Sequence, residues 1–114
     1  MNTRLLDPAT TFATHAFLER VRQRFDVAEA ILFGSRARGD FSPESDADVA
    51  VLLHGKPGCL VPTKLDMSDI AYDILLDTGI NVSPLPVWLD EWEHPETYSN
   101  PRLLANISRE GVRL

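Results

Sequence analysis

The sequence predicts one small domain of the α/β class (α+β), in which helices are packed on a small mixed β-sheet. Three observations lead to this prediction. The chain has 114 residues, enough for one modest core. Segments with helical periodicity alternate along it with short apolar runs typical of buried strands. No internal repeat, low-complexity segment or Gly/Ser linker divides the chain, so we expect a single domain over residues 1–114.

The first half of the chain predicts a helix followed by two strands. A helix is expected over residues 10–25, because its apolar side chains fall on one face. These side chains are Phe17, Leu18, Val21 and Phe25. Residues 28–33 predict a short strand that ends at Gly34. Residues 48–53 predict a second strand that is apolar after its first acid, as expected of a strand covered on both faces.

A loop and a third helical segment follow. Prolines and a glycine predict the loop over residues 57–62, and apolar spacing predicts a helix over residues 67–77 that Gly79 ends. An acidic stripe follows the polar side of this helix at spacings of three, four and four residues. It consists of Asp66, Asp69, Asp73 and Asp77. Two interpretations remain open: a solvated helix face, or a docking face for a basic partner.

The last third of the chain predicts a strand and a helix. Residues 80–88 form the strand, and Pro84 and Pro86 place it at a sheet edge or make its end irregular. The final helix begins after Asn100, a good N-cap, and Gly111 closes it.

Composition limits the functional classes. The net charge of −6 argues against a template-bound polymerase, because phosphate contacts with nucleic acid require a basic surface. It permits a small basic site and suits a basic partner. No stretch of about 18 apolar residues exists, and no apolar N-terminal segment resembles a secretory signal, so we expect a cytoplasmic protein without a membrane span. Cys59 is the only cysteine, and the three histidines lack metal-ligand spacing.

The run GSRARGDFSPESDADVAVL at residues 34–52 contains the residues that indicate chemistry. Gly34 at a strand end lets the backbone approach a phosphate closely, and the following N–H groups point at it. Ser35 adds a hydroxyl donor. Arg36 and Arg38 add positive charge, although only one is expected to point inward, because residues two apart do not share a helix face.

Two carboxylates follow this turn. Asp46 and Asp48 are two residues apart, so on a strand they point to the same face, about 7 Å apart. Two hard carboxylates opposite a phosphate-binding turn suit Mg²⁺ that shares its ligands with a nucleoside triphosphate. The metal would polarise the phosphate and offset the charge that develops during transfer.

The run contains one motif, in which Gly-Ser is followed by ten residues and then by Asp-x-Asp. This motif resembles the active-site signature of the DNA polymerase β-like nucleotidyltransferase superfamily. The extended run GSRARG…SDADVAVL resembles the minimal nucleotidyltransferases, small prokaryotic proteins usually made beside a HEPN-domain partner. The strong match covers residues 30–54, and residues 100–112 show a weaker similarity. The resemblance implies the polymerase β-like nucleotidyltransferase fold.

The resemblance also implies an activity. Gly34 and Ser35, with Arg36 beside them, would bind the triphosphate of ATP, while Asp46 and Asp48 would be the catalytic ligands of Mg²⁺. Members of this family act as antitoxins in toxin–antitoxin systems, and some transfer AMP from ATP to a tyrosine of the HEPN toxin. The implied protein is therefore an antitoxin-type nucleotidyltransferase that forms a hetero-oligomer with a HEPN-domain toxin.

One feature departs from the family pattern. Active members carry a third carboxylate on the neighbouring strand, where this chain offers Asn81 and Ser83, neither a useful general base near pH 7. A catalytically degenerate domain that neutralises its partner by binding alone is therefore an alternative. A nucleotidyltransferase acting on a small molecule such as an antibiotic is another, disfavoured because the chain has no room for the extra substrate-binding domain of such enzymes.

Overall fold

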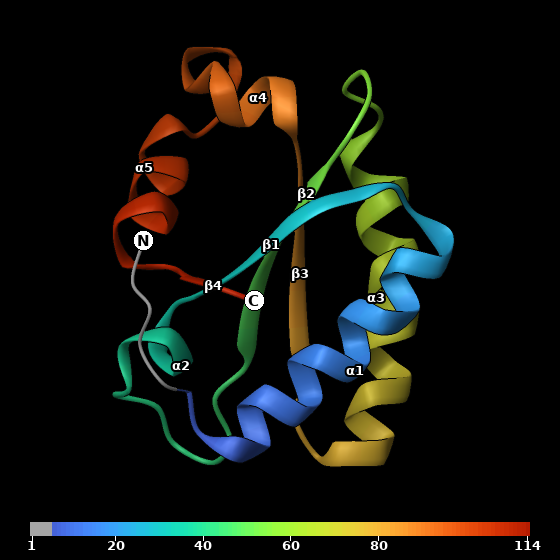
Figure 1. The fold of residues 1–114 in the computed structure, drawn as a ribbon, viewed down its shortest axis with the longest axis vertical. Helices are drawn as coiled ribbons and strands as arrows, with labels where there is room; N and C mark the ends of the chain where they lie inside the picture. Colours follow the sequence, from blue (N-terminus) through green and yellow to red (C-terminus); the bar gives the residue numbers. More distant parts are fainter. Residues whose placement is uncertain (1–5) are drawn as a thin grey trace.

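A computed structural model describes residues 6–114 of the chain (Figure 1). The elements are α1 (Pro8–Arg24), β1 (Val27–Phe33), α2 (Ser35–Arg38), β2 (Ala47–Leu53), α3 (Leu60–Thr78), β3 (Val82–Trp88), α4 (Leu89–Glu93), η1 (Pro95–Thr97), α5 (Pro101–Glu110) and β4 (Val112–Arg113). The strands form one mixed sheet in the order β3-β2-β1-β4. β1 is antiparallel to β2 and to β4, whereas β2 and β3 are parallel. The predicted α/β class with a small mixed sheet is confirmed.

Helices cover both faces of the sheet. α1 and α3 pack on one face, and α4 and α5 pack on the other (Figure 1). Side chains alternate across β2, so Val49 and Val51 lie in the core beneath α1 and α3, whereas Ala50 and Leu52 lie in the core beneath α5. By the same alternation Asp48 lies on the α5 side of the sheet, at the N-terminal end of β2.

The first helix begins two residues earlier than its apolar spacing predicts. The side chain of Asp7 caps it by accepting a hydrogen bond from the backbone N–H of Thr10 at 2.9 Å. Pro8 occupies the first turn, where a helix needs no backbone donor. A cap of this kind satisfies orphan N–H groups, so the helix extends to Asp7 although its apolar face starts later.

The two edges of the sheet differ in how well the sequence predicts them. β3 lies at one edge, as its two prolines predict, because only an edge strand tolerates residues without a backbone donor. β4 lies at the other edge and was not predicted, since two residues are too short to show strand periodicity. It pairs with β1 through Leu32 and Val112, and Arg113 forms an ion pair with Glu29.

The boundary of α3 corrects the prediction of a loop over residues 57–62 and a helix start at 67. The helix begins at Leu60, and Pro62 is its third residue. A proline is tolerated there because the first N–H groups of a helix have no intrahelical acceptor. Gly79 ends the helix in the left-handed conformation, as predicted, with φ of +79°.

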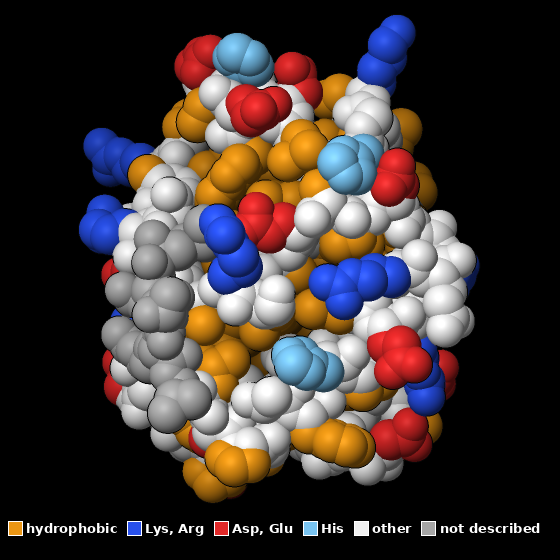
Figure 2. All heavy atoms as spheres, viewed as in Figure 1, with side chains coloured by type: hydrophobic (Ala, Val, Ile, Leu, Met, Phe, Trp, Pro, Cys, Tyr) orange, Lys and Arg blue, Asp and Glu red, His pale blue; other side chains and the backbone are white. Residues whose placement is uncertain are grey.

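The face seen in Figure 2 carries both apolar and charged side chains. Charges of both signs are scattered over that face, and no continuous basic patch gathers there. Within residues 6–114, no helix is both long and apolar enough to cross a bilayer.

Candidate functional site

The Gly-Ser turn and the second aspartate of Asp-x-Asp meet at one end of the sheet. In the antiparallel register of β1 and β2, Phe33 lies opposite Asp48, and Gly34 follows directly. A Cβ atom on Gly34 would overlap Oδ2 of Asp48. Gly34 also has φ of +78°, a conformation that side chains rarely adopt. Both the close approach to Asp48 and the positive φ require glycine at this position. The turn therefore lies directly against the Asp48 carboxylate.

The short helix α2 starts at this turn. Its backbone closes tightly, because the N–H groups of Ala37 and Arg38 both donate to the Gly34 carbonyl at 3.1 Å. Gly39 then ends the helix by donating to the Ser35 carbonyl at 2.9 Å. Ser35 is half-buried beside Gly34, so its hydroxyl is held in the same turn. The turn thus brings its backbone and Ser35 to the N-terminal end of β2, where Asp48 lies; its role in binding phosphate stays a prediction.

The two carboxylates form an electrostatically unfavourable pair. Asp46 is exposed at the end of the preceding loop, and Asp48 is half-buried on β2. Burial raises the pKa of Asp48, the negative charge of Asp46 raises it further, and the positive charge of Arg38 opposes the rise. A divalent cation between the carboxylates would offset this repulsion. Two hard oxygen ligands fit Mg²⁺, which takes one or two carboxylates and completes its coordination with phosphate oxygens and water.

The parallel pairing of β2 with β3 shows which residue stands beside this pair. Ser83 lies in register with Asp48, and the Asn81 carbonyl accepts a hydrogen bond from the Ala47 N–H at 2.9 Å. In the described part of the chain, no group of three or more His, Cys, Asp or Glu side chains is placed to hold a metal. The site therefore has two carboxylates, with a serine hydroxyl in the neighbouring strand position.

Arg36 requires a correction, because its side chain does not point toward the carboxylates. It is 4% exposed and donates to the carbonyl of Ser45 at 2.8 Å and to the Thr10 hydroxyl at 2.8 Å. It also donates to the Pro43 carbonyl at 3.2 Å and stacks over the Phe41 ring. These contacts tie the loop before Asp46 to both α1 and α2. Arg36 thus positions the loop rather than contacting phosphate.

Arg38 is the basic residue nearest the carboxylates, and the prediction of site residues omitted it. Its side chain is 44% exposed and pairs with Asp40 at 3.3 Å and with Glu110 at 3.5 Å. Its positive charge acts on Asp48. Helical geometry predicts that only one of the two arginines points inward. It does not predict which one, because that depends on how residues 40–46 fold back over α2.

A first prediction separates the two arginines. Arg36→Met should lower the free energy of unfolding by about 2–4 kcal/mol, since it leaves the buried Thr10 hydroxyl and two partly buried loop carbonyls without their donor. Arg38→Met removes only exposed ion pairs and should change stability by less than about 1 kcal/mol. Urea denaturation of both variants measures the difference. Equal losses would mean that the loop does not depend on Arg36.

A second prediction concerns the charge of Asp48. Because its pKa is raised in the folded state, the folded protein binds more protons than the unfolded chain between the ordinary pKa and the raised one. The ionised carboxylate therefore destabilises the fold at neutral pH, and this destabilisation disappears as the pH falls through that window. Asp48→Asn should raise Tm at pH 7, and the gain should vanish in acid. Asp26→Asn, in an exposed loop, is the control and should leave Tm unchanged. A lower Tm for Asp48→Asn at pH 7 would contradict the inference that the ionised Asp48 carboxylate destabilises the fold.

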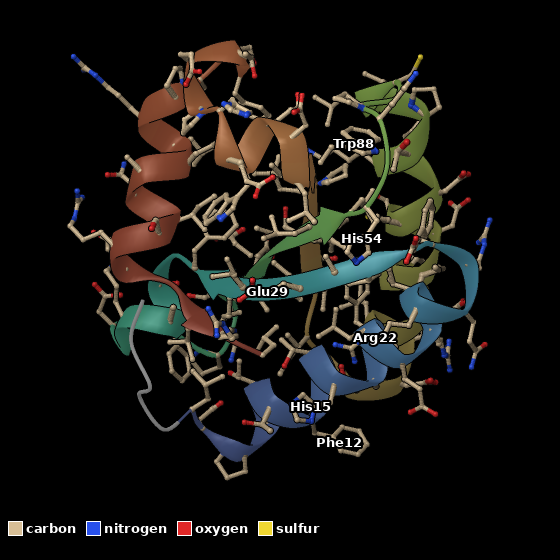
Figure 3. The ribbon with its side chains drawn as sticks, turned by 45° about the horizontal axis from the view of Figure 1, so that its top comes forward. Phe12, His15, Arg22, Glu29, His54 and Trp88 are labelled. Atoms are coloured by element: carbon tan, nitrogen blue, oxygen red, sulfur yellow. The ribbon has the colours of Figure 1, made fainter. Side chains whose placement is uncertain are left out.

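The histidines do not join this site. His54 follows the C-terminal end of β2, whereas Asp48 lies near its N-terminal end, a separation of about 20 Å along the strand. Figure 3 shows His54 at that far end and His15 beside Phe12 on α1. His54 is therefore remote from the carboxylates.

The fold and this constellation define a nucleotidyltransferase-type domain, and comparison with known families agrees. The family model described as "Nucleotidyltransferase domain" matches residues 15–93, a range that includes both the Gly-Ser turn and the two aspartates. The chain belongs to this family.

Two individual proteins are similar to this chain. Over 73 residues it is 36% identical to a protein of Methanocaldococcus jannaschii named "Putative protein adenylyltransferase". That alignment covers 62% of this chain and 50% of the relative, so the chain spans about half of the relative's length. A crystal structure described as a "putative nucleotidyltransferase" from Sulfolobus solfataricus has the same fold, with a TM-score of 0.50 and 22% identity. The match covers 77% of this chain and 81% of the other.

Proposed function

We propose that the protein is an antitoxin-type nucleotidyltransferase that transfers AMP from Mg²⁺-ATP to a hydroxyl of a HEPN-domain toxin. The observation that carries the proposal is the contact of Gly34 with the Asp48 carboxylate, which sets a phosphate-binding turn against a metal-binding pair. Membership of the nucleotidyltransferase family supports the reaction type. The name of the Methanocaldococcus relative supports AMP as the group and a protein as the acceptor.

Each site residue has a stated task in this reaction. Asp46 and Asp48 hold Mg²⁺, which when bound neutralises charge on the reacting phosphates. The Gly34 backbone and the Ser35 hydroxyl orient the triphosphate, and Arg38 adds positive charge beside Asp48. The acceptor oxygen forms a bond to the α-phosphorus, the bond from that phosphorus to the bridging oxygen breaks, and pyrophosphate leaves.

The proton of the acceptor hydroxyl has no strong base on this chain's neighbouring strand, where Ser83 stands beside Asp48. Water or a group of the partner receives it. Ser83 also favours a second candidate function, a domain that neutralises the toxin by contact without transfer.

Intact-mass spectrometry distinguishes the two functions. A candidate HEPN-domain protein is incubated with this protein, ATP and Mg²⁺. A mass gain of one or more AMP groups supports transfer. A stable complex without mass gain supports neutralisation by binding. If no complex forms and no mass is gained, the HEPN partner is rejected.

A further inference from the structure

An apolar line of side chains runs along the solvent side of α3. Within residues 6–114, five of the six exposed large hydrophobic residues lie on this helix, at Leu60, Val61, Leu65, Tyr72 and Leu76. The last four, spaced by four, seven and four residues, fall on one helix face and are here called the outer ridge. Each is 59–66% exposed. The ridge extends over 15 residues, or about 22 Å.

The outer ridge lies opposite the face that α3 uses for its own fold. The buried residues Met67, Ile70 and Ile74 point to the sheet, and helical geometry turns the ridge away from them. Figure 1 shows α3 near the outside of the molecule, beside α1 and the sheet, and the ridge residues are exposed there. Contiguous exposed apolar surface of this kind marks interaction sites on soluble domains.

The charges beside the ridge are negative. The acidic stripe runs along the side facing α1, where Arg20 pairs with Asp73 at 3.6 Å and with Asp77 at 3.4 Å. Asp66 and Asp69 form no ion pair with any other residue of the described range 6–114. Lys64 is the only basic residue on the helix. Part of the stripe thus stabilises the α1–α3 contact, and part remains available to a partner.

These charges discriminate between possible occupants. Antiparallel pairing with a second copy about a twofold axis would place the two acidic sides against each other, and each copy carries a net charge of −6. Anionic lipid and nucleic acid are repelled in the same way. A protein surface with apolar side chains bordered by Lys or Arg complements both the ridge and its acidic side.

We propose that the outer ridge of α3 docks a protein partner that presents an apolar stripe bordered by basic side chains. The inference rests on the proposed function only in taking this partner to be the acceptor of the nucleotidyl group. The C-terminal end of α3 leads through residues 79–81 into β3, where Ser83 lies beside Asp48. The C-terminal end of the ridge thus lies toward the end of the sheet that carries Asp48, while the Asp48 side chain lies on the opposite, α5 side of the sheet.

The surface is tested first with two model helical peptides that share a leucine stripe, one bordered by lysine and one by glutamate. Fluorescence anisotropy should show at least tenfold tighter binding of the lysine peptide. Leu65→Gln/Leu76→Gln should weaken that binding at least tenfold, and Asp66→Asn/Asp69→Asn should reduce the preference for lysine. Phe12→Gln, at a residue 68% exposed on α1, is the matched control and should have no effect. Equal binding of both peptides, or insensitivity to the ridge variants, overturns the proposal.

The HEPN-domain protein then separates this inference from the proposed function. Loss of the complex in the ridge variant, with Phe12→Gln unaffected, supports docking on α3. A complex that tolerates the ridge variant overturns docking while the proposed function stands. Ridge-dependent binding of the lysine peptide without any HEPN complex rejects the HEPN partner and leaves the docking surface in place. Sedimentation of the protein alone provides a further check, because a dimer that the ridge variant dissociates would show that a second copy occupies the surface.

Discussion

Replacing Asp46 and Asp48 by asparagine is expected to lower nucleotidyl transfer by at least about a hundredfold, with the fold and the partner complex retained. The asparagines match the carboxylates in size but give no charged ligand for Mg²⁺. Removing electrostatic stabilisation of a transferring phosphate typically lowers the rate by about 10²–10³-fold. The measurement is the rate of AMP addition to the HEPN-domain protein, followed by intact mass, with complex formation measured on the same samples.

The control for this pair is Asp26→Asn/Asp90→Asn, which removes two exposed acids and changes the net charge by the same amount. It should transfer AMP at the wild-type rate. Unchanged transfer by the Asp46→Asn/Asp48→Asn protein would show that the two carboxylates are not the metal ligands. If that variant still binds the toxin but no longer neutralises it, neutralisation by contact without transfer is ruled out.

Replacing Gly34 by alanine should abolish most of the transfer activity and also destabilise the protein. The new Cβ overlaps Oδ2 of Asp48, and the backbone must keep φ of +78°. The backbone of Gly34, with φ of +78° and ψ of −159°, lies in a region that is essentially limited to glycine, and holding an alanine there costs about 1–3 kcal/mol. Displacing the carboxylate adds a loss of transfer of about a hundredfold, because reacting groups tolerate little misplacement. Denaturation and transfer assays on the same variant measure the two effects.

Gly79→Ala is the control for positive φ, because Gly79 has φ of +79° in the left-handed helical region and nothing within 4 Å of an added Cβ. It should destabilise the backbone without the loss of transfer. If both variants lose transfer to the same extent at a temperature where both are folded, strain alone accounts for the effect. The contact between Gly34 and Asp48 would then have no particular catalytic importance.

Much of the site could be predicted because its pieces are close in the sequence. Two apolar strands joined by a short turn-prone loop must pair as neighbours, so the end of β1 meets the start of β2. That local pairing brings Gly34 to Asp48, as the spacing of the motif indicates. The prolines of β3 likewise predict an edge strand, because a missing N–H is a property of the residue itself.

Other features were missed or wrong, one for a local reason and one because it depends on a contact between distant segments. The helix α3 begins seven residues before its predicted start, because the position of Pro62 in the first turn makes it compatible with helix. β4 exists only because Val112 and Arg113 reach the free edge of β1. No periodicity within two residues indicates such a pairing.

The sequence by itself determined the class of fold, the meeting of the Gly-Ser turn with Asp48, and the absence of an acid at Asn81 and Ser83. These properties follow from residue type and from pairing between neighbouring strands. Only the tertiary structure decided that Arg36 is buried under the loop while Arg38 acts on Asp48, because the direction of each side chain depends on how α1 and residues 40–46 pack on α2. It also divided the apolar residues of α3 between core and solvent. Which side of α3 is buried depends on the sheet against which it packs, and that sheet is built from strands elsewhere in the chain.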